Sequence, residues 1–148
     1  PLPAAGAGGQ QPRILHVEDD PDIRSLVARL LEKEMEVTPA ATLAEARTYA
    51  LTEAFDLAVI DVELPDGSGL DVVPLLKNAY GHTLPIVIFS AGDPPASAME
   101  RVTAILLKSR ASHQELVATI RSLVRTPGTP SVDSFSANPA STDKNSSI

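Results

Sequence analysis

The feature that most constrains the fold is a short apolar run, Leu57–Ile60, that ends directly at Asp61. The run contains β-branched residues and no polar residue, which is the pattern of a strand buried on both faces of a sheet. Residues 62–67 contain proline and glycine, which predicts a loop. Asp61 either caps the next segment or lies at the carboxyl end of a central strand, where open parallel sheets bind ligands.

Strands and helices alternate through the middle of the chain. Further strands are predicted at residues 14–17, 35–38, 85–89 and 104–107. Helices are expected at residues 21–31, 43–54, 70–79, 93–102 and 113–124. Five strand-helix units predict an α/β fold with three layers, (βα)5, and a parallel five-stranded sheet in the flavodoxin-like strand order 2-1-3-4-5.

Two helix starts have a recognisable local sequence. Thr42 and Ser112 each precede a glutamate by three residues, which is the capping-box pattern. The helix at 70–79 is less regular because it contains Pro74, which cannot donate a backbone hydrogen bond. We expect this helix to start late, with Asp71 as its N-cap, or to be kinked.

Composition limits the classes of protein to consider. The chain has 148 residues, 43% of them hydrophobic, which suits one folded domain. Residues 13–125 are expected to form it, residues 1–12 a flexible linker, and residues 126–148 a disordered Ser/Pro-rich tail. No cysteine, signal peptide or membrane span is found, as expected of a cytoplasmic protein. A net charge of −7 argues against direct nucleic-acid or anionic-membrane partners.

Polar side chains follow the other predicted strands as well. Glu18 and Asp19 follow the first strand, Ser90 the fourth and Lys108 the fifth. Carboxyl ends of parallel strands meet at one edge, so these groups should converge on Asp61. Clustered carboxylates repel one another, and a Mg²⁺ ion with oxygen ligands would relieve that repulsion. The arrangement suits a carboxylate that attacks phosphorus.

Four motifs carry a resemblance that covers the whole predicted domain. They are RILHVEDD at residues 13–20, DVELPDGSG at 61–69, FSA at 89–91 and LLK at 106–108. In this order they resemble the receiver domain of two-component response regulators. The resemblance implies that Asp61 accepts a phosphoryl group from the phosphohistidine of a histidine kinase or histidine phosphotransfer domain. It implies a signalling module that phosphorylates and dephosphorylates itself rather than an enzyme in the usual sense.

The resemblance also assigns the surrounding residues. Asp19 would bind Mg²⁺ directly, Glu18 through water, and the backbone carbonyl of Glu63 would complete the protein ligands together with Asp61. Ser90 would hydrogen-bond the phosphoryl group and move inward on phosphorylation. Lys108 would pair with the phosphoryl group.

Three departures from the family pattern suggest an altered output surface. Ser109 follows the lysine where the family has proline, often with a cis peptide bond, so this bond is either trans or a strained cis bond. Ile105 occupies the position of the usual switching aromatic residue. The segment from Ser90 to Lys108 is shorter than usual by about one helical turn, which predicts a truncated fourth helix.

Two other functions are compatible with these residues. One is a receiver-fold interaction module that no longer switches, which Ile105, Ser109 and the short fourth helix favour. The other is a phosphohydrolase of the haloacid-dehalogenase type, which would need an aspartate where Glu63 stands and a cap domain. The sequence after Leu107 also resembles receivers at the carboxyl end of hybrid histidine kinases. The apolar faces of the first and last helices serve either the core or a homodimer.

The remaining polar residues have ordinary structural interpretations. His16 lies within a predicted strand and is expected to be partly buried and hydrogen-bonded. His82 and His113 are expected in solvent. Asp20 is expected to cap the first helix, and Asp66 with Gly67 is expected to form a turn.

Overall fold

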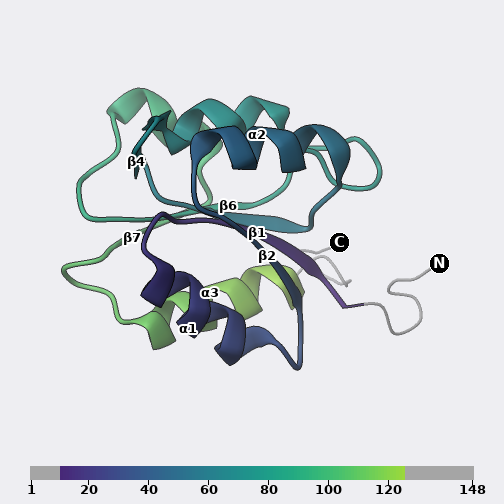
Figure 1. Ribbon diagram of the computed structural model, residues 1–148, viewed down its shortest axis with the longest axis horizontal. Coiled ribbons are helices and arrows are strands. Elements are labelled where there is room, and N and C mark those ends of the chain that lie inside the picture. The colour runs from purple at the N-terminus through teal and green to yellow at the C-terminus, as the bar shows by residue number, and fades with distance from the viewer. Residues whose placement is uncertain (1–10, 126–148) are drawn as a thin grey trace, which may run out of the picture. The chain divides into compact units, whose positions relative to one another are not determined.

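The computed structural model describes residues 11–125 and contains one parallel five-stranded sheet (Figure 1). Its strands are β1 (Arg13–Val17), β2 (Glu36–Ala40), β3 (Leu57–Ile60), β6 (Ile86–Ser90) and β7 (Ala104–Leu107). They lie in the order β2-β1-β3-β6-β7, and each neighbouring pair is parallel. This is the order 2-1-3-4-5, so the predicted α/β fold is confirmed.

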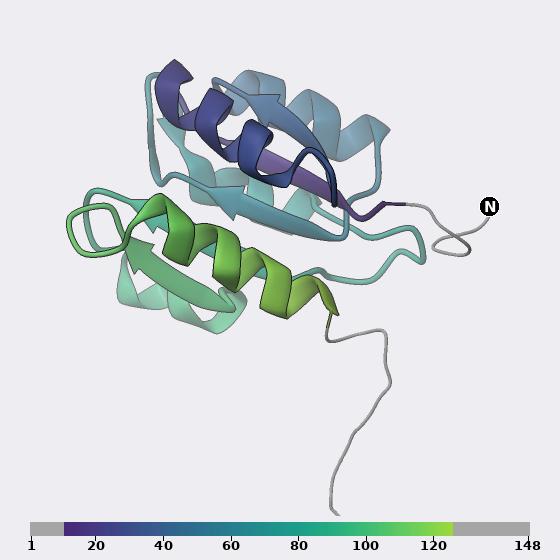
Figure 2. The ribbon, with the colours of Figure 1, turned by 90° about the horizontal axis from the view of Figure 1, so that it is seen from below.

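Helices α1 (Pro21–Leu31) and α2 (Leu43–Thr52) cover opposite faces of the sheet (Figure 1). Seen from the α1 side, this helix crosses over β1 (Figure 2). The buried side chains of α2 and of the sheet face beneath it form one apolar cluster, which includes Leu43, Ala46 and Ala50. β3 is buried along its whole length, as a central strand between two helical layers requires.

The helix starts follow the predicted local chemistry. The Asp20 side chain accepts a hydrogen bond from the Asp22 amide and caps α1. The Thr42 hydroxyl accepts one from the Glu45 amide and caps α2. α3 (His113–Arg125) begins at the predicted capping box, where Ser112 and Glu115 exchange hydrogen bonds.

The prediction of an α-helix at residues 70–79 is wrong. The chain forms a 3₁₀-helix there, η2 (Gly69–Leu75), which is capped by Ser68 rather than by Asp71. Pro74 lies inside it and removes a backbone donor that a continuing α-helix would need. The segment before β7 is likewise a short 3₁₀-helix, η3 (Ala96–Arg101).

The loop after β3 contains a small hairpin that was not predicted. Strands β4 (Glu63–Leu64) and β5 (Gly67–Ser68) pair in antiparallel fashion. Pro65 and Asp66 form the turn between them, so the predicted turn begins one residue earlier than expected, and Gly67 is the first residue of β5. Gly67 has a φ of +146°, which residues other than glycine rarely adopt. The hairpin therefore replaces an irregular loop with an ordered element beside Asp61.

The chain divides within α3 into two compact units, residues 1–117 and 118–148. The sheet and the polar groups at its carboxyl edge belong to the first unit. In the second, the described part is the end of α3. The linker predicted for residues 1–12, apart from its last two residues, and the tail predicted for 126–148 lie outside the described residues. Within residues 11–125, every helix is too short or too polar to cross a membrane.

Candidate functional site

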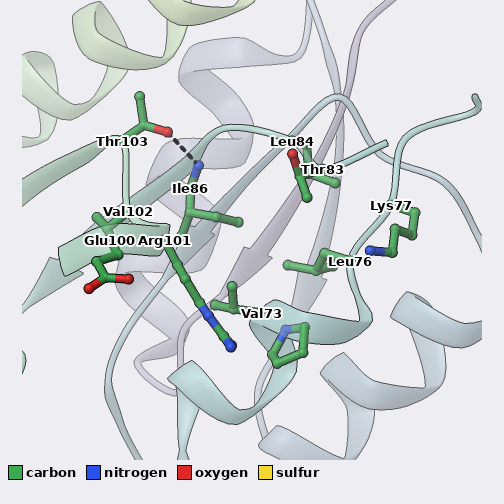
Figure 3. A pocket seen from close by; sticks show the side chains of 11 residues that line it. Val73, Leu76, Lys77, Thr83, Leu84, Ile86, Glu100, Arg101, Val102 and Thr103 are labelled. Atoms are coloured by element: carbon green, nitrogen blue, oxygen red, sulfur yellow. Dashed lines mark hydrogen bonds between the residues drawn. The ribbon is translucent and has the colours of Figure 1, made fainter. Parts of the chain in front are cut away.

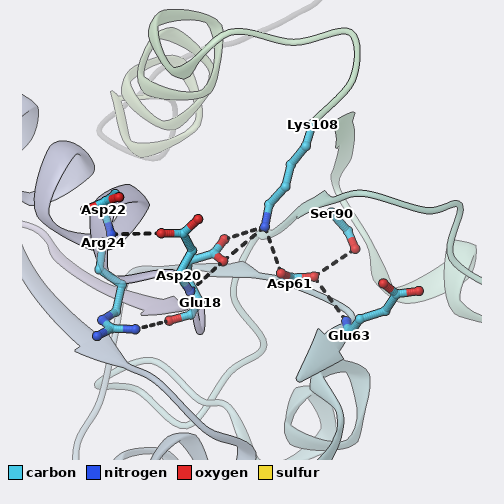
Figure 4. Close-up of polar contacts among 8 residues, drawn as sticks. All are labelled: Glu18, Asp20, Asp22, Arg24, Asp61, Glu63, Ser90 and Lys108. Atoms are coloured by element: carbon cyan, nitrogen blue, oxygen red, sulfur yellow. Dashed lines mark hydrogen bonds and ion pairs between the residues drawn. The ribbon is translucent and has the colours of Figure 1, made fainter. Parts of the chain in front are cut away.

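Asp61 lies at the carboxyl end of β3 and is the centre of a hydrogen-bonded cluster (Figure 4). Its Oδ1 accepts hydrogen bonds from the Ser90 hydroxyl at 2.8 Å and from the Glu63 amide at 3.1 Å. Its Oδ2 accepts one from the Lys108 ammonium at 2.9 Å. Asp61 is 5% exposed and Ser90 is fully buried, so these bonds form largely out of water. The ends of β3, β6 and β7 thus bring three predicted site residues together.

Glu18 follows β1 and supplies a second buried carboxylate, 1% exposed. The Lys108 ammonium lies 2.9 Å from its Oε1 and 3.0 Å from its Oε2, and it donates a hydrogen bond to Oε2. The Asp20 amide donates a second bond to Oε2, whereas the buried Oε1 accepts no hydrogen bond. Burial raises the pKa of Glu18, and the hydrogen bond from Lys108 opposes that rise only in part.

Lys108 holds the two carboxylates together. Burial alone would lower the pKa of its ammonium, but the hydrogen bonds to Asp61 and Glu18 outweigh burial and raise it. The ammonium therefore stays charged at neutral pH. It also lies 5.8 Å from the centre of the Phe89 ring, a geometry that favours a cation.

Three carboxylates beside this lysine lie close enough together to bind one metal ion. Glu18, Asp19 and Asp61 each offer an oxygen within 4.8 Å of the others, and Asp19 is exposed while the other two are buried. An all-oxygen set that keeps room for water on its exposed side suits Mg²⁺. The buried Oε1 of Glu18 is ion-paired with the Lys108 ammonium at 2.9 Å and accepts no hydrogen bond, so it keeps a lone pair for such an ion. The residues present therefore fit a magnesium site.

The backbone of Glu63 contacts Asp61, but its side chain does not. Its amide bonds to Asp61, while its carboxylate points away from Asp61 (Figure 4). A ligand role for the Glu63 carbonyl stays a prediction.

The expectation for His16 is wrong. Its side chain is 1% exposed, and neither ring nitrogen has a hydrogen-bond partner. Burial, followed by the charges of Lys108 and Arg24, lowers its pKa to about 4, so the ring is neutral at neutral pH. His113 also differs from expectation, because it is half-buried with its ring 5.9 Å from that of Phe89. His82 is exposed as expected.

Two of the three departures from the family pattern, at Ser109 and Ile105, can be examined beside the site. The described peptide bonds are all trans, so the bond before Ser109 takes the trans alternative. Ile105 packs partly buried against the apolar cluster under α2. Ser90 already donates its hydroxyl to Asp61 in this structure. The Ser90 side chain therefore faces Asp61 before any phosphorylation, and an inward movement of Ser90 on phosphorylation would begin from this position.

Asp66 is a residue whose contacts were not predicted. Its two carboxylate oxygens accept hydrogen bonds from the amides of Leu43 and Ala44, at 2.8 and 3.0 Å. The bond to Leu43, followed by that to Ala44, lowers the pKa of this exposed carboxyl group. The local sequence around Asp66 shows a turn, and it carries no signal for a contact with a helix more than twenty residues away.

A cavity of about 490 Å³ lies at the opposite, amino-terminal ends of β6 and β7 (Figure 3). Its walls include Leu84, Ile86 and Val102, and Lys77 and Arg101 approach it from different sides (Figure 3). None of the predicted site residues lines it. The predicted chemistry therefore belongs to the carboxyl edge of the sheet and not to this cavity.

Comparison with known proteins agrees with this geometry. The chain is 33% identical over 132 residues to the probable transcriptional regulatory protein TcrX of Mycobacterium tuberculosis. That match covers 86% of the chain and 56% of TcrX. It is 32% identical over 137 residues to the sensor histidine kinase TmoS of Ectopseudomonas mendocina. That match covers 84% of the chain and 14% of TmoS. The chain thus spans about half the length, or less, of these relatives.

A solved structure and a family profile give the same assignment. The structure of a CheY-like receiver domain from Methylobacillus flagellatus superposes with a TM-score of 0.65 at 26% identity, and the match covers 77% of this chain and 99% of that one. The profile of the response regulator receiver domain matches residues 14–121. With the carboxylates, the serine and the lysine in place at the carboxyl edge of the sheet, the chain belongs to the response regulator receiver domain family.

Proposed function

We propose that this receiver domain takes a phosphoryl group onto the Asp61 carboxylate from the phosphohistidine of a histidine kinase or histidine phosphotransfer domain. The supporting observation is the cluster in which Ser90 and Lys108 both bond to Asp61 beside two further carboxylates. In the transfer, the P–N bond to the donor histidine breaks and a P–O bond to Asp61 forms. The donor imidazole leaves with the electron pair and takes up a proton from solvent.

The residues around Asp61 have separate tasks in this proposal. Lys108 supplies a fixed positive charge next to the incoming phosphoryl oxygens, and Ser90 supplies a hydroxyl donor. Both are held by neighbouring strands, so little reorganisation is needed when charge arrives. Burial keeps competing water away from Asp61.

Glu18, Asp19 and Asp61 would hold Mg²⁺, with the Glu63 carbonyl as a further ligand. When bound, the ion supplies positive charge that offsets the repulsion between the carboxylates and the phosphoryl group. The feature that favours an ion here is the set of three carboxylates, which share a single ammonium, that of Lys108.

Intact mass after incubation with Mg²⁺ and acetyl phosphate tests the proposal. The native chain should gain one phosphoryl group, and Asp61→Asn should gain none, because an amide oxygen does not form the acyl phosphate. A gain of equal size in both proteins would contradict the role of Asp61. If neither protein gains mass, a purified phosphohistidine protein replaces acetyl phosphate, and failure with that donor as well would refute phosphoacceptor activity.

Lys108→Met should raise the affinity for Mg²⁺ by roughly tenfold, because the lysine and the ion compete for the same carboxylates. The same change should lower the free energy of unfolding in magnesium-free buffer by about 2 kcal/mol, since it leaves Glu18 buried without its cation. Isothermal titration calorimetry and urea unfolding measure the two effects.

Lys77→Met is the matched control for this prediction. Lys77 is exposed and lies by the cavity at the opposite edge of the sheet. It should change neither quantity measurably. Equal Mg²⁺ affinities for the native chain and Lys108→Met would show that Lys108 does not act on the ion-binding carboxylates.

A second candidate is a receiver-fold interaction module that no longer switches. It is favoured by Ile105, which has no polar ring to rotate, and by Ser90, which already bonds to Asp61. Amide exchange of β6, β7 and α3 with and without beryllofluoride discriminates between the candidates. Unchanged exchange despite bound beryllofluoride supports the module that does not switch.

The similarity to TmoS supports a second setting for the domain, as a receiver attached to a histidine kinase. In that setting the donor phosphohistidine would belong to the same protein or to a phosphotransfer partner. Phosphoryl transfer from a hybrid kinase core that is supplied separately would test this context.

A further inference from the structure

The hairpin that follows Asp61 is hydrogen-bonded to the first turn of helix α2. Asp66, in the turn between β4 and β5, accepts hydrogen bonds from the amides of Leu43 and Ala44, the first two residues of α2. The first amides of a helix have no partner within the helix and carry partial positive charge. The lowered pKa of Asp66 fits a carboxylate that stays charged in this position.

The same hairpin is fixed at its other end to the reacting carboxylate. The Glu63 amide bonds to Asp61, and the Gly69 amide bonds to the Val62 carbonyl at 2.9 Å. Gly69 packs so closely that a Cβ atom there would lie 2.1 Å from the Asp61 backbone oxygen. Both ends of residues 61–69 are therefore held at the site, and the turn between β4 and β5 is held at α2 by the Asp66 carboxylate.

Besides Asp66, the contact that holds the hairpin on the domain is the partly buried side chain of Leu64, which packs against the apolar core cluster. The strands of the hairpin are two residues each and pair only with one another, which leaves them marginal by themselves. A charged carboxylate that accepts two amide hydrogen bonds is a strong local anchor. The conformation of Glu63, and with it the direction of its carbonyl, should therefore depend on this anchor.

We propose that Asp66 is a positioning residue that sets the Asp61–Glu63 segment for cation binding by anchoring the hairpin to the first turn of α2. This inference rests on the proposed function and adds a structural link between the site and α2. By thermodynamic linkage, a cation that favours the anchored hairpin must also strengthen the contact between Asp66 and α2. The start of α2 would then respond to occupancy of the site.

Capping of α2 alone would also account for the two hydrogen bonds, and the chain offers a control for that. Thr42 caps the same first turn, with its hydroxyl 3.1 Å from the Glu45 amide, but it is not part of the hairpin. Thr42→Ala should therefore destabilise α2 without releasing the segment after Asp61. Asp66→Ala should do both.

The experiment measures the dissociation constant for Mg²⁺ by calorimetry for the native chain, Asp66→Ala, Asp66→Asn and Thr42→Ala. We expect Asp66→Ala to weaken Mg²⁺ binding by roughly tenfold and Thr42→Ala by less than about twofold. Asp66→Asn keeps one acceptor oxygen and should fall between the native chain and Asp66→Ala. It also serves as the test variant if Asp66→Ala does not fold.

Amide hydrogen exchange gives a second readout that a capping role would not change. In the native chain, the Leu43 and Ala44 amides should exchange more slowly when Mg²⁺ is present, and in Thr42→Ala this response should persist. Asp66→Asn should weaken the response. Equal Mg²⁺ affinities for the native chain and the Asp66 variants, or equal losses in the Asp66 and Thr42 variants, would overturn the inference.

Failure of the proposed function would look different. In that case the native chain itself would neither bind Mg²⁺ nor gain a phosphoryl group, and the inference would fall with it. A native chain that does both, with Asp66 variants that match Thr42→Ala, would refute the positioning role alone.

Discussion

Gly69→Ala is expected to lower the free energy of unfolding by about 3 kcal/mol or more, at the upper end of what overpacking costs. A Cβ atom at this buried position would lie 2.1 Å from the Asp61 backbone oxygen and 2.6 Å from a side-chain carbon of Ile60. Neither neighbour can yield easily, because one is backbone and the other belongs to the fully buried strand β3. Urea unfolding at neutral pH measures the loss.

Gly92→Ala is the control for this prediction. A Cβ atom at Gly92 would meet the Glu63 carboxylate at 3.7 Å, which is an ordinary contact. Its effect should be roughly 0.5 kcal/mol or less. If the Gly69 and Gly92 variants unfold at the same urea concentration, the close approach of Gly69 to Asp61 is not a feature of the folded protein.

His16 should make the domain sensitive to mild acid. In the unfolded chain its pKa is about 6.5, whereas burial and nearby cations hold it at about 4 in the folded chain. As the pH falls from about 6.5 to 4, the unfolded chain binds a proton that the folded chain refuses. Stability is thus fully present above about 6.5, and about 3 kcal/mol of it is lost by pH 4.

His16→Leu removes this titration and also removes two buried ring nitrogens that lack partners. At pH 7 the variant should be as stable as the native chain or more stable by about 1 kcal/mol. Urea unfolding of both proteins at several pH values, in magnesium-free buffer, gives the difference between them. Glu18, whose pKa is raised, acts in the opposite direction in both proteins. Identical pH dependence in the two proteins would contradict the prediction.

The sheet and the residues at its carboxyl edge could be predicted because both depend on local patterns. Apolar runs mark buried strands, and a parallel sheet brings their carboxyl ends together whatever the length of chain between them. Glu18, Asp61, Ser90 and Lys108 converge for that reason alone. Their contacts followed from topology and needed no knowledge of the connecting segments.

The features that could not be predicted depend on contacts that the local sequence does not show. Apolar spacing after Gly69 suggested an α-helix, but Pro74 and the close packing of Gly69 on Asp61 favour a shorter 3₁₀-helix. Asp66 shows the pattern of a turn, and its bonds to the start of α2 appear only in three dimensions. His16 was expected to find a partner because most buried polar groups do, and here it has none.

The Lys108 amide donates a backbone hydrogen bond to the Ser90 carbonyl at 2.8 Å, just where β6 and β7 end. The two residues whose side chains bond to Asp61 are thereby joined directly, by a backbone hydrogen bond between neighbouring strands. Residues 91–101, which lie between the strands, can consequently change in length or composition without moving the hydroxyl and the ammonium apart, provided that β7 still pairs with β6. Such a segment is a natural insertion point, where an engineer could graft a binding loop and leave the chemistry of the domain intact.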